Sequence, residues 1–231
     1  MRILFIAADR REFRGVLRRS GETGATPLDV NWARTARLNA HEVLLAANGA
    51  GTARAASAAD AALKAFPAEA IVSTGFCGAV DPLLEVADVV VATFVAAGER
   101  RYPALPASSA SAFRQGLVRT LDHVAQTAGE KQDLRAAGVC AVEMEAAGVA
   151  ARAQDAGLPF YCIRAVTDLA GETMANDFNN ALRPNGRFDT ISILGSSLRH
   201  PAARLPELFR LRSRCDRASR ALGDFLADCR F

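Results

Sequence analysis

No stretch of the sequence approaches the roughly 20 consecutive apolar residues that a membrane-spanning helix requires. The first residues are MRILFIAADRREF, whose apolar core is too short for a secretory signal peptide and is followed at once by charges. These absences predict a cytoplasmic protein. They leave open a peripheral contact with the inner face of a membrane.

Histidine and cysteine are both scarce. The three histidines lie far apart, without the spacing of metal ligands: His41, His123 and His200. The five cysteines are odd in number, lack a CxxC pair and mostly lie in apolar runs, which is typical of buried thiols in a reducing compartment. We therefore expect no metal and no bound cofactor.

The excess of charge is small as well. A formal net charge of +3 is too low to indicate a nucleic-acid partner. The basic residues are nearly all arginines, however, and they crowd toward the C-terminus.

What is present predicts one large α/β domain. Half of the 231 residues are hydrophobic, enough for a sizeable core in a single domain over residues 1–231, with a helical segment at about 190–231. Strands are expected at 3–8, 42–47, 70–74, 86–96, 116–124, 139–142 and 159–166, and helices at 52–66, 127–137, 145–156, 190–199 and 205–229. Residues 21–27, 98–111 and 170–189 are expected to be irregular, and 32–39 stays unassigned. Strands that alternate with helices predict a mainly parallel, mixed central sheet flanked by helices.

Acidic residues follow two of these strands. The segment VCAVEMEAAG at 139–148 ends its apolar run with Glu143, Met144 and Glu145, and Asp168 ends the next strand. Open α/β sheets bind ligands at this place, so the carboxylates can converge on one crevice. Because a strand gives way to a helix within the glutamate pair, we expect only one of them to face the crevice. Glu145 is preferred, since a carboxylate suits the first turn of a helix. An ordinary solvated helix start explains the same pattern.

Two further segments have two interpretations each. The loop at 48–51 contains Gly49 and Gly51 between a strand and a helix, which suits close backbone approach and anion binding but equally suits an ordinary turn. The charged residues Arg10, Arg11 and Glu12 follow the first strand closely, either as a solvated turn or as part of the site.

Three segments in this order resemble the superfamily of nucleoside phosphorylases and methylthioadenosine/adenosylhomocysteine nucleosidases: IVSTGFCGAVDPLLEVADVVVA, AVEMEAAGVA and IRAVTDLAG. The resemblance extends from residue 3 to about 169. The C-terminal part, ALRPNGRFDTISILGSSLRHPAARLPELFRLRSRCDRASRAL, is similar to the hopanoid-associated phosphorylases, which act on adenosylhopane, an adenine nucleoside carried by a triterpenoid lipid. The resemblance implies a three-layer nucleoside phosphorylase-like fold and a homo-oligomer. It also implies a small or lipid-linked adenine nucleoside as substrate.

The resemblance also implies roles for single residues. Asp168 matches the acid that protonates purine N7, and Glu12 the acid that positions the attacking water in the hydrolases. The expected substrate-binding residues are Glu145 on the ribose hydroxyls, Met144 against the sugar, His123 and Val124 at the base, and Glu143 and Phe76. Cleavage of an N-glycosidic bond needs such a set, because positive charge builds on the ribose while electrons flow into the base.

The phosphate site departs from the family pattern. Ser73 stands where the hexameric phosphorylases have an arginine, and Phe76 where a serine is common. The replacements available are Arg10, Arg11, Gly49, Gly51 and Gly75. The C-terminal resemblance favours phosphorolysis with inorganic phosphate as co-substrate. Hydrolysis by a nucleosidase is the alternative, which Glu12 supports. A catalytically silent nucleoside-binding protein is a third hypothesis, which the carboxylates disfavour.

The last predicted helix is basic and amphipathic. Six arginines (204, 210, 212, 214, 217 and 220) alternate with apolar residues such as Leu208, Leu222 and Phe225. Such a helix can lie on an anionic membrane surface or can pack its apolar stripe on the domain. The spacing alone favours the packed helix, and the two arrangements can coexist.

Overall fold

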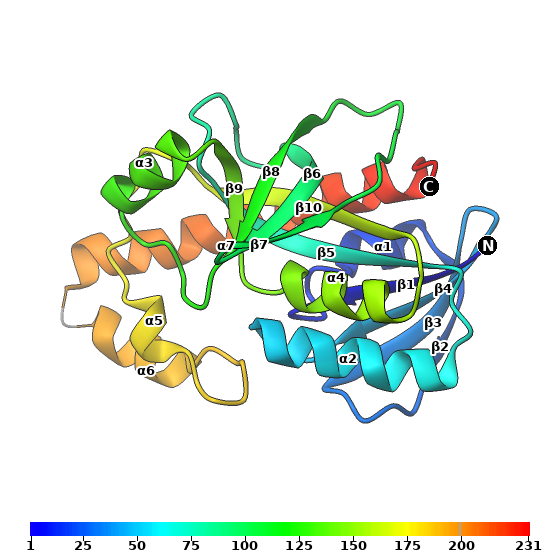
Figure 1. The fold of residues 1–231 in the computed structure, drawn as a ribbon. Coiled ribbons are helices and arrows are strands. Elements are labelled where there is room, and N and C mark those ends of the chain that lie inside the picture. Colours follow the sequence, from blue (N-terminus) through cyan, green and yellow to red (C-terminus); the bar gives the residue numbers. More distant parts are fainter. Residues whose placement is uncertain (199) are drawn as a thin grey trace.

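The strands of the protein join in one mixed sheet of ten strands (Figure 1). The computed structural model describes residues 1–198 and 200–231. The strands are β1 (Arg2–Ala7), β2 (Gly21–Ala25), β3 (Trp32–Leu38), β4 (His41–Ala47), β5 (Ala70–Ala79), β6 (Val89–Ala97), β7 (Arg100–Pro103), β8 (Arg114–Thr120), β9 (Val139–Glu143) and β10 (Phe160–Asp168). The helices are α1 (Arg14–Arg19), α2 (Thr52–Ala65), α3 (Ala128–Ala136), α4 (Ala146–Asp155), α5 (Phe178–Ala181), α6 (Thr190–Ser197) and α7 (Pro201–Ala227).

The order of the strands brings several C-terminal strand ends to one edge. Along the sheet the order is β10-β6-β8-β9-β5-β1-β4-β3-β2. β10 also pairs with β5, so that β5, β10, β6, β8 and β9 close into a ring. The pairs β1–β4, β1–β5 and β5–β10 are parallel. The residues that follow β1 and β4 therefore lie near Gly75 of β5 and Arg164 of β10.

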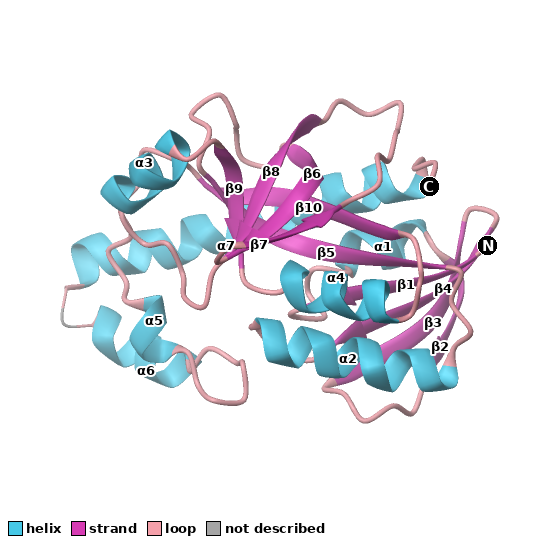
Figure 2. Cartoon of the chain, in the orientation of Figure 1, coloured by secondary structure: helices cyan, strands magenta, loops and turns pink. Residues whose placement is uncertain are grey.

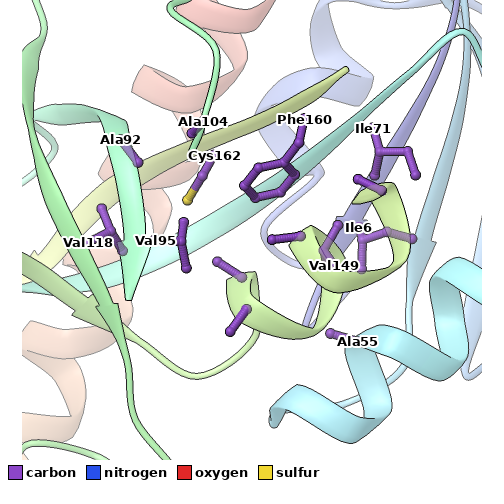
Figure 3. Close-up of a cluster of buried hydrophobic side chains, with 14 of the residues drawn as sticks. Ile6, Ala55, Ile71, Ala92, Val95, Ala104, Val118, Val149, Phe160 and Cys162 are labelled. Carbon is purple, nitrogen blue, oxygen red and sulfur yellow. The ribbon is translucent and has the colours of Figure 1, made fainter. Parts of the chain in front are cut away.

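Helices cover both faces of the sheet (Figure 2). Residues of β1 alternate between the faces, as the two-residue period of a strand requires. Ile6 packs with Ala55 of α2 and Val149 of α4 in one apolar cluster, shown in Figure 3. Phe5 packs with Phe225 of α7 in the cluster on the opposite face. None of the described helices is long and apolar enough to span a bilayer.

Several predicted boundaries and irregular passages differ from the structure. β2 lies in the expected break at 21–27; all five of its residues are exposed, so pairing with β3 alone explains it. β5 continues from residue 74 to Ala79 through Gly75 and Gly78, where an added Cβ would lie 2.4 Å from Glu12 Oε1 and 2.7 Å from Asp168 Oδ2, respectively. β7 and α5 lie in passages expected to be irregular.

The C-terminal helices follow the expected order. α6 ends at Ser197 and the last residue of the predicted helix, 199, lies outside the described residues. α7 begins at Pro201, four residues earlier than expected, because proline suits the first turn of a helix. Half of the predicted capping box forms: the Thr127 side chain accepts a hydrogen bond from the Glu130 amide at the start of α3, whereas the Glu130 carboxylate contacts His123.

Candidate active site

Glu143 is the last residue of β9, and Glu145 follows the strand. Both lie beside β5, although β9 runs antiparallel to β5. Ala79 pairs with Ala141, and Gly78 pairs with Val142. Continuing from this register, the chain after Val142 runs back along β5 toward Gly75. The residues after β9 therefore reach the same edge as the ends of the parallel strands.

A buried arginine lies at the centre of this edge. The side chain of Arg164, in β10, is fully buried. Its Nη2 donates to Glu143 Oε2 at 2.5 Å and to Ser73 Oγ at 2.7 Å, and its Nη1 donates to the Thr74 carbonyl at 2.9 Å. Nη1 also lies 3.5 Å from Glu145 Oε2. Arg164 was not among the expected site residues, although an arginine inside the apolar run PFYCIRAV is a usable signal.

Glu143 has no acceptor capacity left for a ligand. Its Oε2 accepts from the Glu145 amide at 2.8 Å and from the Ala146 amide at 2.7 Å, in addition to Arg164. Its Oε1 accepts from the Thr120 hydroxyl. Glu143 therefore caps the N-terminus of α4 and balances the charge of Arg164.

The Glu145 side chain is buried, but its hydrogen bonds are long. It is the N-cap residue of α4, and its Oε1 accepts from the Gly51 amide at 3.2 Å. Burial, together with the neighbouring Glu143 carboxylate, raises the pKa of Glu145 to about 8. Both glutamates reach Arg164, and the expectation that only one of the pair faces a ligand stays a prediction. Only Glu145 keeps acceptor capacity for a ligand.

Glu12 approaches the same cluster from the turn after β1. Its Oε2 accepts from the Asp9 amide at 2.8 Å and its Oε1 from the Phe76 amide at 2.7 Å. Gly75 has φ +134°, and a Cβ there would lie 2.4 Å from Glu12 Oε1 and 3.0 Å from Arg164 Nη1. Glycine is therefore required at this position. Burial raises the pKa of Glu12.

Asp168 ends β10 beside a lysine. Lys131 Nζ lies 2.5 Å from Asp168 Oδ2, and the side chain of Lys131 is only 1% exposed. Burial raises the pKa of Asp168, and the Lys131 ammonium opposes this effect. Lys131 was not among the expected site residues, and the polar sequence of α3 contains no signal for it.

A cavity of about 170 Å³ adjoins Asp168. Its walls include the apolar side chains of Met174, Phe178 and Leu211 and the ion pair between Glu172 and Arg214. A mixed apolar and polar cavity beside an acid is suited to a heterocyclic base.

Of the two residues expected at the base, His123 is engaged in ion pairs and Val124 packs against apolar residues. His123 forms ion pairs with Asp122 and Glu130, each at 2.6 Å, and these contacts raise the pKa of its half-exposed imidazole. Val124 packs beside Phe178 and Met174. Its amide donates to Asn179 Oδ1 at 2.7 Å, and its carbonyl accepts from Asn179 Nδ2 at 3.0 Å.

Met144 and Phe76 lie at the edges of the carboxylate cluster. Met144 is buried, and its carbonyl accepts from the Thr52 hydroxyl at 3.2 Å. The Phe76 ring is half-buried in the cluster under α7, so this residue meets Glu12 through its backbone amide.

The proposed phosphate ligands are largely engaged elsewhere. The Gly49 amide donates to the Ala8 carbonyl at 2.8 Å, and the Gly51 amide is the donor to Glu145. Arg11 forms an exposed ion pair with Asp9 at 2.8 Å, and Arg10 is exposed. Among the residues that the structure describes, neither arginine forms a hydrogen bond or ion pair with the buried carboxylates.

Comparisons with known proteins agree with this fold. The family model of the phosphorylase superfamily matches residues 2–131 and 112–186. The 5′-methylthioadenosine/S-adenosylhomocysteine nucleosidase of Geobacillus thermodenitrificans is 29% identical over 178 residues, which are 64% of this chain and 75% of that protein.

Two solved structures have the same architecture. The nucleosidase of that name from Neisseria meningitidis, in complex with methylthio-immucillin-A, superimposes with a TM-score of 0.74 over 98% of this chain and 97% of that one, at 20% identity. Futalosine hydrolase of Helicobacter pylori has a TM-score of 0.72 over 98% and 95%, at 17% identity. At these identities the likeness establishes the fold alone.

Proposed function

Because the chain belongs to the phosphorylase superfamily, we propose that it hydrolyses the N-glycosidic bond of an adenine nucleoside. The observation that carries this proposal is the charge balance of the site. Three buried carboxyl groups (Glu12, Glu143 and Glu145) surround one guanidinium, that of Arg164. This arrangement stabilises the positive charge that develops on the ribose in the transition state. When Glu12 and Glu145 are ionised, it opposes the entry of an anionic phosphate, because like charges repel strongly where water is excluded.

Each side chain has a distinct role in the proposed reaction. Asp168 donates its proton to N7 of the purine, so that the electron pair of the C1′–N9 bond passes into a neutral leaving base. Glu145 accepts hydrogen bonds from the ribose hydroxyls, through the lone pairs that Gly51 and Arg164 leave free. A water molecule attacks C1′ and gives a proton to Glu12, whose raised pKa suits a general base.

Two further observations support hydrolysis. Thr74 Oγ1 and Arg164 Nε are buried without a hydrogen-bond partner in the described part of the chain, so polar groups are available to orient a small nucleophile. The curated relative described above is named a nucleosidase. The C-terminal residues favoured phosphorolysis, with hydrolysis as the alternative, and the comparisons support this alternative better.

Phosphorolysis of an adenosylhopane-type nucleoside is the second candidate. The observation that favours it is the resemblance of residues 181–222 to the hopanoid-associated phosphorylases. Position 73 holds a serine where the hexameric phosphorylases have an arginine, and the Ser73 hydroxyl accepts a hydrogen bond from Arg164. This argues against a phosphate site there.

The decisive assay measures adenine release from methylthioadenosine, adenosylhomocysteine and a long-chain 5′-alkyl adenosine, with and without phosphate. We expect equal rates in both buffers and the free sugar as product. Phosphate-dependent release with a ribose 1-phosphate product would establish phosphorolysis instead. No release of adenine from any of these compounds would favour a binding protein.

The first variant to test is Asp168→Asn. It removes the proton donor with little change in volume, so we expect folding and nucleoside binding to persist while turnover falls by about 10²–10⁴-fold. Turnover by this variant at the wild-type rate would exclude Asp168 as the general acid. Circular dichroism and binding of a non-hydrolysable adenosine analogue control for folding.

Assembly and membrane contact are also proposed. The resemblance to the family supports a homo-oligomer. The apolar stripe of α7 is buried at Leu222, Phe225 and Leu226, as expected for a packed helix. Phe209 is nevertheless 72% exposed, and it lines a shallow depression of about 380 Å³ with arginines on the same face of α7. We propose that this face contacts anionic lipid.

A further inference from the structure

Lys131 is the only buried residue of α3. An α-helix normally buries apolar side chains, and a lysine is almost never fully buried unless it is paired. Here Nζ donates to Asp168 Oδ2 at 2.5 Å and to the Leu169 carbonyl at 2.8 Å. Figure 1 shows α3 beside the end of β9, separate from the helices that cover the sheet. The one fully buried side chain of α3 therefore contacts a candidate catalytic carboxyl through its ammonium group.

The ammonium distinguishes the two oxygens of Asp168. Oδ2 is held by Lys131, and it lies so close to β5 that a Cβ on Gly78 would be 2.7 Å from it. Oδ1 has one contact, at 3.1 Å from the Thr167 hydroxyl. That hydroxyl can instead donate to the Cys77 carbonyl at 3.3 Å. Oδ1 is therefore the oxygen that is free to carry a proton and to pass it on.

The other charged groups near Asp168 are engaged with one another. Glu172, on the loop after β10, forms a two-point ion pair with Arg214 of α7 at 2.7 and 2.8 Å. Glu207 of α7 accepts from the amides of Ala175 and Asn176. Arg210 is exposed at the rim of the cavity, and the Cys77 thiol of β5 is buried with a pKa well above its usual value. Within the described residues, Lys131 is the cation in direct contact with Asp168.

We propose that Lys131 is a positioning residue of the reaction, which directs the acid proton to Oδ1 of Asp168 and stabilises the carboxylate that remains after proton transfer. This inference rests on the proposed function. In that step the O–H bond at Oδ1 breaks and an N–H bond forms on the base. The C1′–N9 electron pair passes to the base, and the new negative charge on Asp168 faces an ammonium 2.5 Å away. Transition-state stabilisation of this kind lowers the barrier to departure of the base.

The test compares two leaving groups in Lys131→Met, which keeps an unbranched side chain one atom shorter and removes its charge. Adenine needs protonation to depart, whereas 4-nitrophenolate does not. We expect kcat for an adenine nucleoside to fall by about 10–100-fold with a nearly unchanged KM, and hydrolysis of 4-nitrophenyl riboside to stay within about threefold of wild type. The matched control is Lys64→Met, which removes the only other lysine, exposed on α2, and should change neither rate.

The pH profile gives a second readout. The ammonium favours the ionised form of Asp168, so its removal extends the protonated form to higher pH. The alkaline limb of kcat/KM for the adenine nucleoside should therefore move upward in Lys131→Met by about one pH unit. An equal loss on both substrates with an unmoved alkaline limb would show that Lys131 only supports the fold. Unchanged rates on both substrates would show that it has no role.

A measurement on the unmodified protein covers the case in which the variant does not fold. Because the chain contains two lysines, ¹⁵N-lysine labelling yields two side-chain ammonium signals. We expect the Lys131 signal to exchange slowly with water and to shift in Asp168→Asn, while the Lys64 signal does neither. Fast exchange at both lysines would overturn the ion pair. If the wild type cleaves 4-nitrophenyl riboside but no adenine nucleoside, the proposed substrate fails while the ion pair remains testable by this signal.

Discussion

Glu143 and Glu145 are two residues apart, yet their surroundings differ. Glu143 accepts four hydrogen bonds, including that from Arg164, and is fully buried in its side chain. Glu145 has two long contacts and a pKa raised to about 8. At the scale of single residues, one carboxylate is structural, and the other is kept in an unfavourable environment that a ligand can relieve.

This difference predicts opposite effects on stability. The folded pKa of Glu145, about 8, lies above its ordinary value of 4.5, so the unfolded chain loses the proton first as pH rises. Its contribution to stability is therefore present below about pH 4.5 and is lost as pH rises toward 8. Glu145→Gln should raise Tm relative to wild type, by an amount that grows between pH 5 and pH 8.

Glu143→Gln is the matched control. It leaves the buried Arg164 without its main ionic partner, which costs about 3–5 kcal/mol in comparable sites. Its Tm should fall at every pH. Differential scanning fluorimetry of the three proteins across this range measures both effects, and a Tm of Glu145→Gln that falls with the same slope as wild type would refute the raised pKa.

At the scale of secondary-structure elements, helices α1 and α7 cross at close distance. A Cβ on Gly15 would lie 1.7 Å from the Ser219 carbonyl oxygen, and one on Gly223 would lie 2.2 Å from the Gly15 carbonyl carbon. The Ser219 hydroxyl also accepts from the Gly15 amide at 3.0 Å and lies 3.3 Å from the Glu12 carbonyl. This close crossing therefore supports the turn that carries Glu12.

We expect Gly15→Ala and Gly223→Ala to destabilise the protein by at least about 1–3 kcal/mol, because the added methyl groups meet backbone atoms that cannot move alone. Gly195→Ala in α6 is the control. A Cβ there meets nothing within 4 Å, and alanine favours a helix, so its stability should be unchanged or higher. Urea unfolding of the three variants measures the difference, and equal midpoints would contradict the close crossing.

Charge is distributed unevenly over the whole molecule. Residues 183–220 contain nine arginines and three acidic residues, a net charge of +6, whereas the whole chain carries +3. The rest of the chain is therefore slightly acidic. The exposed Phe209 and the arginines Arg212, Arg217 and Arg220 of α7 line one depression in this basic segment.

If this face contacts lipid, the protein should bind vesicles that contain anionic lipid, and binding should weaken with salt. Each basic residue near such a surface contributes about 1 kcal/mol. Replacing Arg212, Arg217 and Arg220 by glutamine should therefore weaken vesicle binding by about 100-fold or more in a sedimentation assay. Replacing the exposed Arg18, Arg100 and Arg101 removes the same charge elsewhere and should have little effect. Equal losses in both triple variants would indicate net charge rather than a surface.

Some features of the structure follow from the sequence by local rules. The apolar runs became β1, β4, β6, β9 and β10, since strands buried on both faces need continuous hydrophobic residues. Thr127 caps α3 at the expected place, because its hydrogen bond with the Glu130 amide joins neighbours in the chain. The same logic places Asp168 at the C-terminal end of a strand, where ligands bind in sheets of this kind.

Other features depend on contacts between distant residues, which no local pattern contains. β2 is strand only through its pairing with β3, and β5 continues through Gly75 because Glu12, 63 residues earlier, occupies the space of a Cβ. The sequence by itself determined the α/β class, the order of the main elements and the acidic residues near the site. Only the tertiary structure decided that Arg164 pairs with Glu143 and that Lys131 pairs with Asp168. A buried charge is tolerated only where folding brings an opposite charge to it, and that partner can lie anywhere in the chain.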